Sequence, residues 1–199
     1  MELWEETDVT ITLDQCAYRL PKGHTLRLAC APSYWPFIWP APHEAEWTIA
    51  SGQLEVPVLD VASTTEVGFE EPEAASPWQI EVLRPAGMTR EVLSEDGEYF
   101  SWLVIETDNG CVKDLAHGLV TGSTCREEWN IPDHTEEAHG RIRWETEMGR
   151  DDWSIRTVCT AEMTADETNW YPRARIEAYE GDTLVFAKDF ASDIPRYLM

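Results

Sequence analysis

Arg141-Ile142-Arg143-Trp144-Glu145-Thr146-Glu147-Met148 is the stretch that decides the fold class of this chain. Charged side chains alternate along it with a mostly apolar set, which is the period of a β-strand with one buried and one solvated face. The turn-forming residues 149–152 follow, and a second alternating run begins at Trp153. The stretch therefore predicts an antiparallel β-hairpin.

Further alternating segments lie on both sides of this hairpin. Residues 173–179 and 183–190 flank Glu180-Gly181-Asp182, which predicts a second hairpin. A third is expected where residues 98–105 lead through Asp108-Asn109-Gly110 into residues 111–112, because Asn-Gly favours a tight turn. Shorter strands are expected at residues 9–13, 26–30, 54–59 and 78–83, the first two joined by a turn at Pro21-Lys22-Gly23.

Helical periodicity is nearly absent, with a brief candidate at residues 132–139, and residues 62–77 have the composition of a surface loop. Many short antiparallel strands are typical of sandwiches. We therefore expect an all-β fold, an antiparallel, jelly-roll-like β-sandwich that comprises residues 1–199 as a single domain.

Charge and composition limit the classes of partner. The chain has 38 acidic residues against 15 lysines and arginines, a net charge of −23, which disfavours nucleic acid and anionic membranes as partners. Its start has no signal-peptide pattern, so we expect a cytoplasmic protein. The five cysteines are an odd number and lie far apart, which predicts reduced thiols in or near the core.

Motifs for catalysis, metals and nucleotides do not occur. No Gly-x-Ser-x-Gly is present, and Ser123 lacks the glycines of a nucleophile turn. His117, His134 and His139 are the best metal candidates, but their spacing favours polar loop residues. No glycine-rich phosphate loop is present either. We therefore expect no catalytic residue, no cofactor and no metal in this chain.

An aromatic and proline-rich segment, residues 33–42, follows the second expected strand. Its aromatic side chains are Tyr34, Trp35, Phe37 and Trp39. Prolines prevent a regular strand here, so the rings must find apolar surroundings in another way. Three interpretations stay open: packing on the domain's own core, a docking surface for a second domain or subunit, and a platform on which a sugar or small ligand stacks.

At this segment the chain resembles a known family. The pattern Tyr18-x-x-Pro21-x-Gly23-His24-x-Leu26-Arg27-Leu28, followed by Ser33-Tyr34-Trp35-Pro36 and Trp39-Pro40, resembles the C-terminal domain of the X-Pro dipeptidyl-peptidase and cocaine-esterase hydrolases. Residues 176–186 and Ile194-Pro195-Arg196 look like the family's last hairpin, so the likeness runs from about residue 8 to residue 196.

The resemblance implies a jelly-roll sandwich that packs on an α/β-hydrolase domain and shapes its active-site region. The Ser-Asp-His triad belongs to that other domain, so no catalytic residue is carried over. The leading hypothesis is therefore a non-catalytic accessory domain whose partner is an α/β-hydrolase domain or chain. The alternatives are a binding module that stacks a ligand on its aromatic patch and, less favoured, an independent enzyme.

The chain also departs from the family pattern. Only eight residues precede Val9, where the family has several strands, so the sandwich is expected to be incomplete on its N-terminal side. Unpaired edges and uncovered apolar faces are costly. We therefore expect a homo-oligomer, a dimer in the simplest case.

Overall fold

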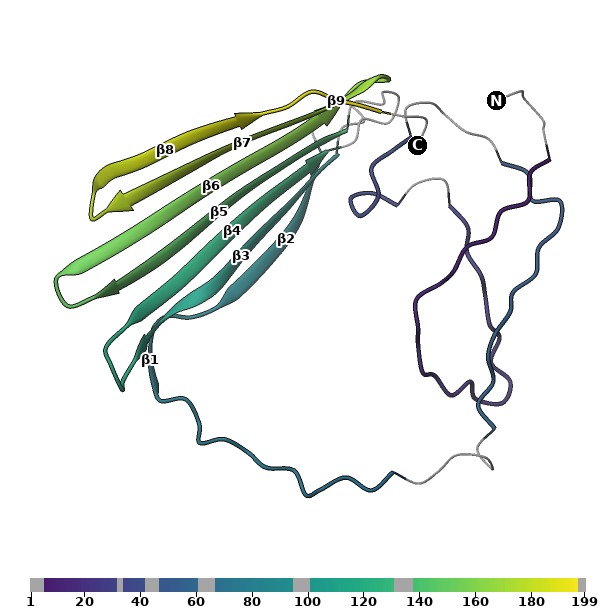
Figure 1. Ribbon diagram of the computed structural model, residues 1–199, viewed down its shortest axis with the longest axis horizontal. Helices are drawn as coiled ribbons and strands as arrows, with labels where there is room; N and C mark the ends of the chain where they lie inside the picture. Colours follow the sequence, from purple (N-terminus) through teal and green to yellow (C-terminus); the bar gives the residue numbers. More distant parts are fainter. Residues whose placement is uncertain are drawn as a thin grey trace. The chain divides into compact units, whose positions relative to one another are not determined.

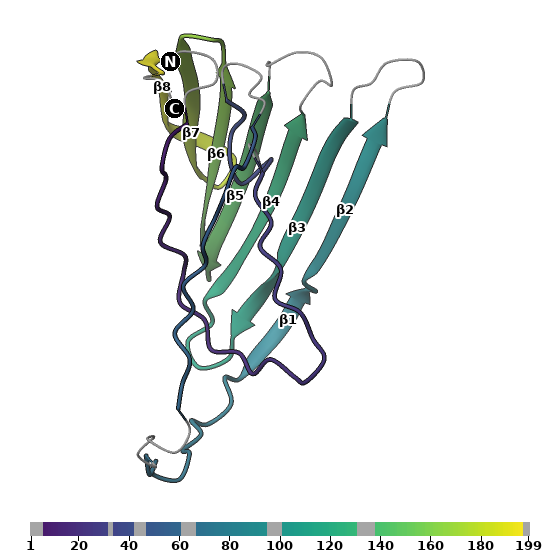
Figure 2. The same ribbon diagram turned by 90° about the vertical axis from the view of Figure 1, so that its right-hand side faces the viewer.

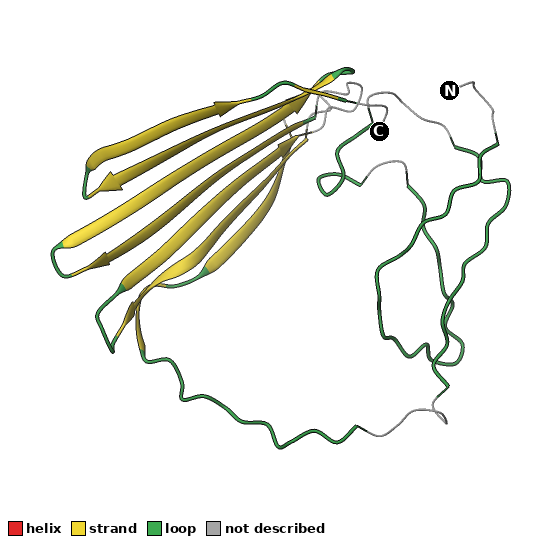
Figure 3. Ribbon diagram, in the orientation of Figure 1, coloured by secondary structure: helices red, strands yellow, loops and turns green. Residues whose placement is uncertain are grey.

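The computed structural model describes residues 6–31, 34–41, 47–60, 67–94, 101–130 and 138–196. Its strands are β1 (Ile80–Arg84), β2 (Gly87–Ser94), β3 (Ser101–Asp114), β4 (Val120–Asn130), β5 (His139–Arg150), β6 (Trp153–Ala165), β7 (Asn169–Glu180), β8 (Thr183–Ala191) and β9 (Ile194–Pro195). The described residues contain no helix, and therefore none long and apolar enough to cross a membrane (Figure 3). The all-β prediction is confirmed.

All of these strands belong to one open antiparallel sheet, which is consistent with a sandwich-like fold (Figure 1). The order is β1-β3-β4-β5-β6-β7-β8, so from β3 to β8 each strand pairs with the next one in sequence (Figure 2). Strands β1 and β2 both pair with β3, and β9 pairs with β7. Short connections between sequence neighbours explain this order, because each hairpin closes locally.

The two C-terminal hairpins are confirmed. Strands β5 and β6 are joined at Asp151-Asp152, where Asp151 has a φ of 52°. Strands β7 and β8 are joined at Gly181-Asp182, where Gly181 has a φ of 56°. Both turns use positive φ values, which the right-handed twist of the flanking strands requires in a two-residue loop.

The prediction of a turn at Asn109-Gly110 is wrong. Strand β3 runs straight through these residues, and the pairing with β4 shifts register between Asp108 and Cys111. Gly110 has a φ of 83°, and its N–H donates to the Asp108 carboxylate over 2.8 Å. The positive φ that the sequence indicated is therefore used in a β-bulge instead of a turn. The bulge divides the β3 edge between β2 and β1.

Three predicted strands, at residues 9–13, 26–30 and 54–59, do not form. In the structure these residues are exposed and have no regular pairing. An alternating segment becomes a strand only where a neighbour satisfies its backbone hydrogen bonds, and among the described residues no strand pairs with these segments. The strand predicted at residues 78–83 is confirmed as β1, which begins at Ile80. The described part of the predicted loop, residues 67–77, has no regular structure.

The chain divides into two units, residues 1–31 and 32–199. In the first unit the predicted turn is present: the His24 N–H donates to the Pro21 carbonyl over 3.1 Å, and Gly23 has a φ of 88°. The sheet belongs to the second unit. The brief helix candidate at residues 132–139 falls outside the described residues except for Ala138 and His139, and His139 begins β5.

The two faces of the sheet differ in chemistry. Cross-strand pairs place their side chains on one face, so the register assigns each residue. The apolar face carries Met88, Val92, Leu103, Ile105, Cys125, Trp129, Ile142, Trp144, Met148, Ile155, Cys159, Met163, Ile176, Phe186 and Phe190. The charged face carries ion pairs such as Arg126 with Glu106 and Glu128, and Arg175 with Glu177 and Asp189. The alternation along residues 141–148 is therefore confirmed.

Candidate functional site

The aromatic turn, residues 34–41, is the described part of the aromatic segment. Its chain reverses between Tyr34 and Ile38, which form a β-bridge, and the Ile38 N–H donates to the Tyr34 carbonyl over 2.7 Å. The rings of Tyr34 and Phe37 stack with centroids 5.5 Å apart. Tyr34 is 64% exposed and Phe37 is 82% exposed, so this pair faces solvent.

The two tryptophans of the aromatic turn are half-buried and pack on the sheet. Trp35 makes an edge contact with Trp129 of β4 at 5.8 Å between centroids, and Trp39 makes one with Trp170 of β7 at 5.5 Å. Trp35 and Trp39 also contact each other at 4.9 Å. Edge-to-face pairs contribute about 0.5–1.5 kcal/mol each beyond area burial, so this cluster fixes the aromatic turn on the sheet.

Arg196 ties the turn to the sheet from the other side. Its Nη2 donates to the Pro40 carbonyl over 2.6 Å, and its Nη1 donates to the Asp166 carbonyl over 2.8 Å. The guanidinium carbon lies 4.1 Å from the ring centroid of Trp170. A planar, multi-donor group suits this role because it can stack and donate at once. Sequence reasoning noticed Arg196 only as part of the family's ending and did not predict this role.

Gly140 of β5 provides the space for Trp129. A methyl group at this position would lie 2.6 Å from Cζ3 and 2.9 Å from Cε3 of the indole. The Trp129 ring therefore lies directly over a residue without a side chain, which lets it reach Trp35. This glycine was not predicted as part of the site. The sequence feature that could have indicated it is its position directly before the alternating stretch.

A groove of 860 Å³ lies between the aromatic turn and the apolar face. Apolar side chains form most of its lining, among them Phe37, Trp39, Trp129, Ile142, Met163 and Phe190. Glu162, Arg173 and Asp189 also line it. Such a lining can hold apolar groups.

The four predicted aromatic residues therefore have two different situations. Trp35 and Trp39 pack on the sheet of the same chain, as the own-core interpretation expects. Tyr34 and Phe37 are exposed, as a docking or ligand surface requires. The structure brings all four together in one turn, but it does not test whether a partner or ligand contacts them.

The residues considered for catalysis or metal binding lie apart. The Ser123 hydroxyl in β4 accepts a hydrogen bond from the Asn109 side chain over 3.0 Å. His117 lies 3.3 Å from Asp114 before β4 begins, whereas His139 pairs across from Asn130 at the other end of β4. His134 is outside the described residues. Within the described ranges, no group of three or more His, Cys, Asp or Glu side chains could hold a metal ion.

The carboxyl group of Asp166 has a strongly lowered pKa, and its role is structural. Its carboxylate accepts hydrogen bonds from the Tyr171 hydroxyl over 2.6 Å and from the N–H groups of Thr168 and Asn169 over 2.7 Å each. These donors, the Tyr171 hydroxyl first, hold the pKa of Asp166 far below its ordinary value. The residue closes the β6–β7 connection, whose backbone also binds Arg196.

All five cysteines are free thiols. Cys111 and Cys125 are buried, and burial raises the pKa of both thiols. Cys16, Cys30 and Cys159 are exposed, so the expectation of core or near-core positions fails for these three. Cys16 follows, and Cys30 ends, an expected strand that does not form, so neither thiol has the core in which it was expected.

Comparison with known proteins gives one match. Residues 5–81 match the family model of the X-Pro dipeptidyl-peptidase C-terminal non-catalytic domain. No curated protein and no solved structure matches the chain. The match contains the whole aromatic turn and ends within β1, so the rest of the sheet lies beyond it. The likeness seen at residues 176–196 stays a prediction. The suspected relationship is thereby supported: residues 5–81 of this chain are similar to the X-Pro dipeptidyl-peptidase C-terminal non-catalytic domain.

Proposed function

We propose that this chain is an accessory module that docks on the catalytic α/β-hydrolase domain of an X-Pro dipeptidyl-peptidase or cocaine-esterase type of enzyme and shapes its active-site region. The observation that carries the proposal is the aromatic turn: it lies within the segment that matches a non-catalytic domain, and it presents two stacked, exposed rings. We place the docking contact at Tyr34 and Phe37.

The geometry of the turn favours docking on energetic grounds. Aromatic side chains are enriched at protein interfaces, and tyrosine is among the residues that contribute most of the binding energy. Ordering such side chains on binding costs about 0.5–1.5 kcal/mol each, unless they are already held in place. Tyr34 and Phe37 are pre-stacked, and the tryptophans beside them are anchored on the sheet. Binding therefore requires little further ordering.

Calorimetric titration tests this docking. The full chain is titrated with the catalytic domain of an X-Pro dipeptidyl-peptidase that lacks its own C-terminal domain. Substitution of both Tyr34→Ser and Phe37→Ser is expected to weaken binding at least thirtyfold, which corresponds to about 2 kcal/mol for an interface anchor. Phe69→Ser is the matched control, because Phe69 is 89% exposed and lies outside the turn. Equal binding by both variants would place the docking surface elsewhere.

The groove supports a second candidate function, a binding module for a small apolar ligand or a sugar. Trp39 and Trp129 line the groove, and aromatic faces stack readily on both classes of ligand. A ligand in the groove would quench or shift the tryptophan fluorescence of the full chain. A saturable change with a sugar or aromatic ligand, in the absence of any binding to the catalytic domain, would favour this function over docking.

The proposal includes self-association into a dimer and action in the cytoplasm without nucleic-acid or membrane partners. The net charge of −23 supports the exclusion of polyanionic partners. The uncovered apolar side chains of the sheet support self-association.

A further inference from the structure

The negative charge of this chain is large, and its size does not depend on how the two units are placed. The chain has 38 acidic residues against 15 lysines and arginines, which gives a formal net charge of −23 at pH 7. Five of the acids lie in residues 1–31, so the second unit, residues 32–199, carries most of the negative charge. Any protein that this chain docks on therefore gains a strongly negative neighbour.

The arginines of the sheet are already paired with carboxylates. Arg84 lies 2.6 Å from the Asp108 carboxylate and 2.7 Å from the Glu147 carboxylate. Ion pairs of the same kind are formed by Arg126, Arg143, Arg156, Arg173 and Arg175. An arginine within such a pair cancels the charge of the acid beside it, so it does little to offset acids elsewhere on the surface.

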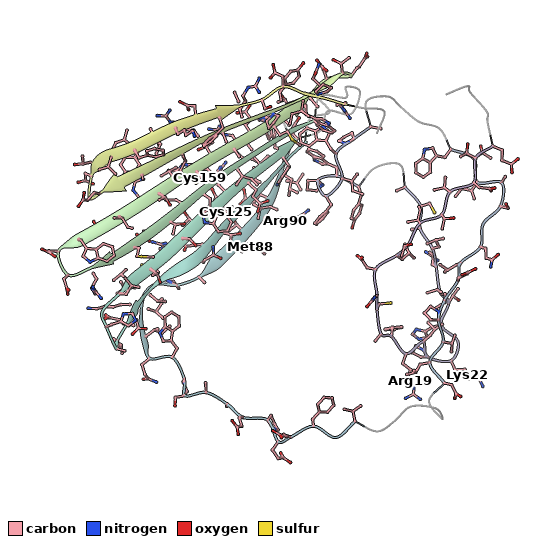
Figure 4. All side chains as sticks on the ribbon, viewed as in Figure 1. Arg19, Lys22, Met88, Arg90, Cys125 and Cys159 are labelled. Atoms are coloured by element: carbon pink, nitrogen blue, oxygen red, sulfur yellow. The ribbon has the colours of Figure 1, made fainter. Side chains whose placement is uncertain are left out.

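Other acids are exposed and have no ion pair with any described residue. They lie in the irregular segment 67–77, at the two hairpin turns and at the end of β7: Glu70, Glu71, Glu73, Asp152, Glu180 and Asp182. Figure 4 labels three cations that also have no ion pair within the described ranges, Arg19 and Lys22 of the first unit and Arg90 of β2. Because acids outnumber cations more than twofold, the field around the chain is negative.

A field of this kind acts on small charged molecules at a distance. Surface potentials of several kT raise the local concentration and the association rate of oppositely charged molecules by about 10–10³-fold. The range is set by the Debye length, about 30 Å at 10 mM ionic strength and about 3 Å at 1 M. The effect therefore extends well beyond the chain at low salt and vanishes at high salt.

We infer that this chain, once docked, concentrates cationic substrates at the active-site region of the catalytic domain and disfavours anionic ones. The inference rests on the proposed docking and names the substrate class that the docked chain favours. No carboxylate has to contact the substrate, because the effect comes from the summed charge of the chain. The proposed docking contact, Tyr34 and Phe37, is a pair of aromatic rings, so salt that screens the field leaves this contact intact.

Three X-Pro p-nitroanilides, in which X is lysine, glutamine or glutamate, provide the test. They share the bond that is cleaved and differ in charge: the lysine substrate has two positive charges, the glutamine substrate one, and the glutamate substrate a net charge of zero. The value of kcat/KM is measured for the isolated catalytic domain with and without a saturating amount of the full chain. Each measurement is made at about 10 mM and at about 1 M ionic strength.

The expected result is a preference that follows charge and disappears with salt. At about 10 mM, the added chain should raise kcat/KM for the lysine substrate at least tenfold more than for the glutamate substrate, with the glutamine substrate between them. At about 1 M, the three substrates should respond equally. An equal response at low salt would overturn the inference. A preference that persists at high salt would also contradict it, because it would indicate a direct ion pair with the substrate.

A charge-reversed variant tests whether the acids of this chain cause the preference. Reversal of the six exposed acids changes the net charge from −23 to −11, because each substitution removes one negative and adds one positive charge. The substitutions are Glu70→Lys, Glu71→Lys, Glu73→Lys, Asp152→Lys, Glu180→Lys and Asp182→Lys. A tenfold preference should then fall to about threefold, since a Coulomb energy is proportional to the charge. The matched control exchanges aspartate and glutamate at the same positions and should keep the preference of wild type.

Calorimetric binding to the catalytic domain, measured at both salt concentrations, separates this inference from the proposal beneath it. A chain that binds at both concentrations but affects the three substrates equally would overturn the inference and leave docking standing. A chain that does not bind would overturn both. If the charge-reversed variant does not fold, the salt series with the wild-type chain still decides.

Discussion

Gly140→Ala is the substitution that tests most simply how the aromatic turn is fixed. The new methyl group would lie 2.6 Å from Cζ3 of Trp129, so the indole must move away from the strand. Such overpacking costs about 1–3 kcal/mol. The displaced ring would also lose part of its edge contact with Trp35, which lies 5.8 Å away between centroids.

One effect opposes this loss. Replacing glycine by alanine restricts the unfolded chain and stabilises by about 0.4–1 kcal/mol where the native backbone allows it. The net expectation is a destabilisation of about 1–2 kcal/mol, which for a chain of this size lowers Tm by roughly 2–8 °C. Thermal unfolding monitored by tryptophan fluorescence measures it.

Gly87→Ala serves as the matched control. Gly87 also lies in a strand of the sheet, and a methyl group there meets nothing within 4 Å. This variant should be as stable as wild type or slightly more stable. A Gly140→Ala protein that matched the control would mean that Trp129 does not occupy the position above Gly140, and the account of the turn would be wrong.

Three further predictions follow from the site. Arg196→Lys removes the paired hydrogen bonds to the Pro40 and Asp166 carbonyls, so amide hydrogen exchange of residues 34–41 should become at least tenfold faster. Unchanged exchange rates would mean that Arg196 does not hold the aromatic turn in place. Asp166→Asn should lower the stability at pH 7, and the variant should lose less stability than wild type below about pH 4. The lowered pKa of Asp166 in the folded state gives stability that is present above the unfolded pKa and lost as the pH falls. Urea midpoints of the two proteins that change in parallel from pH 7 to pH 3 would refute this. Cys111 and Cys125 should react with a thiol reagent only on unfolding, because burial shields both thiols and raises their pKa. Fast reaction in the native state would show that the two thiols are accessible to solvent.

The sequence allowed the C-terminal half of the sheet to be predicted well. The alternation along residues 141–148 predicts a strand reliably, because the turn at residues 151–152 places the partner strand directly beside it. Residues 9–13 and 54–59 show the same alternation and remain unpaired. Period-two alternation predicts on which face of a strand a residue would lie. Whether the strand forms depends on a neighbouring strand, which the alternation does not identify.

The local sequence also allowed more than one structure at Gly110 and in the aromatic turn. A glycine with positive φ fits a turn and a bulge equally well, and only the long-range pairing with β4 selects the bulge. The aromatic turn was found from its composition. Its division into anchored tryptophans and an exposed Tyr34–Phe37 pair could not be predicted, since the anchors Trp129 and Trp170 lie far away in the sequence.

We propose that this chain contributes a binding surface to an enzyme whose bond-breaking residues lie in another domain. Turnover of an X-Pro p-nitroanilide tests it most directly, measured with the purified chain alone, with the isolated catalytic domain, and with both together. We expect no turnover by the chain alone and a changed KM of the catalytic domain when wild type, but not the Tyr34→Ser and Phe37→Ser double variant, is added. Turnover by the chain alone that a single substitution within it abolishes would place the bond-breaking residues in this chain.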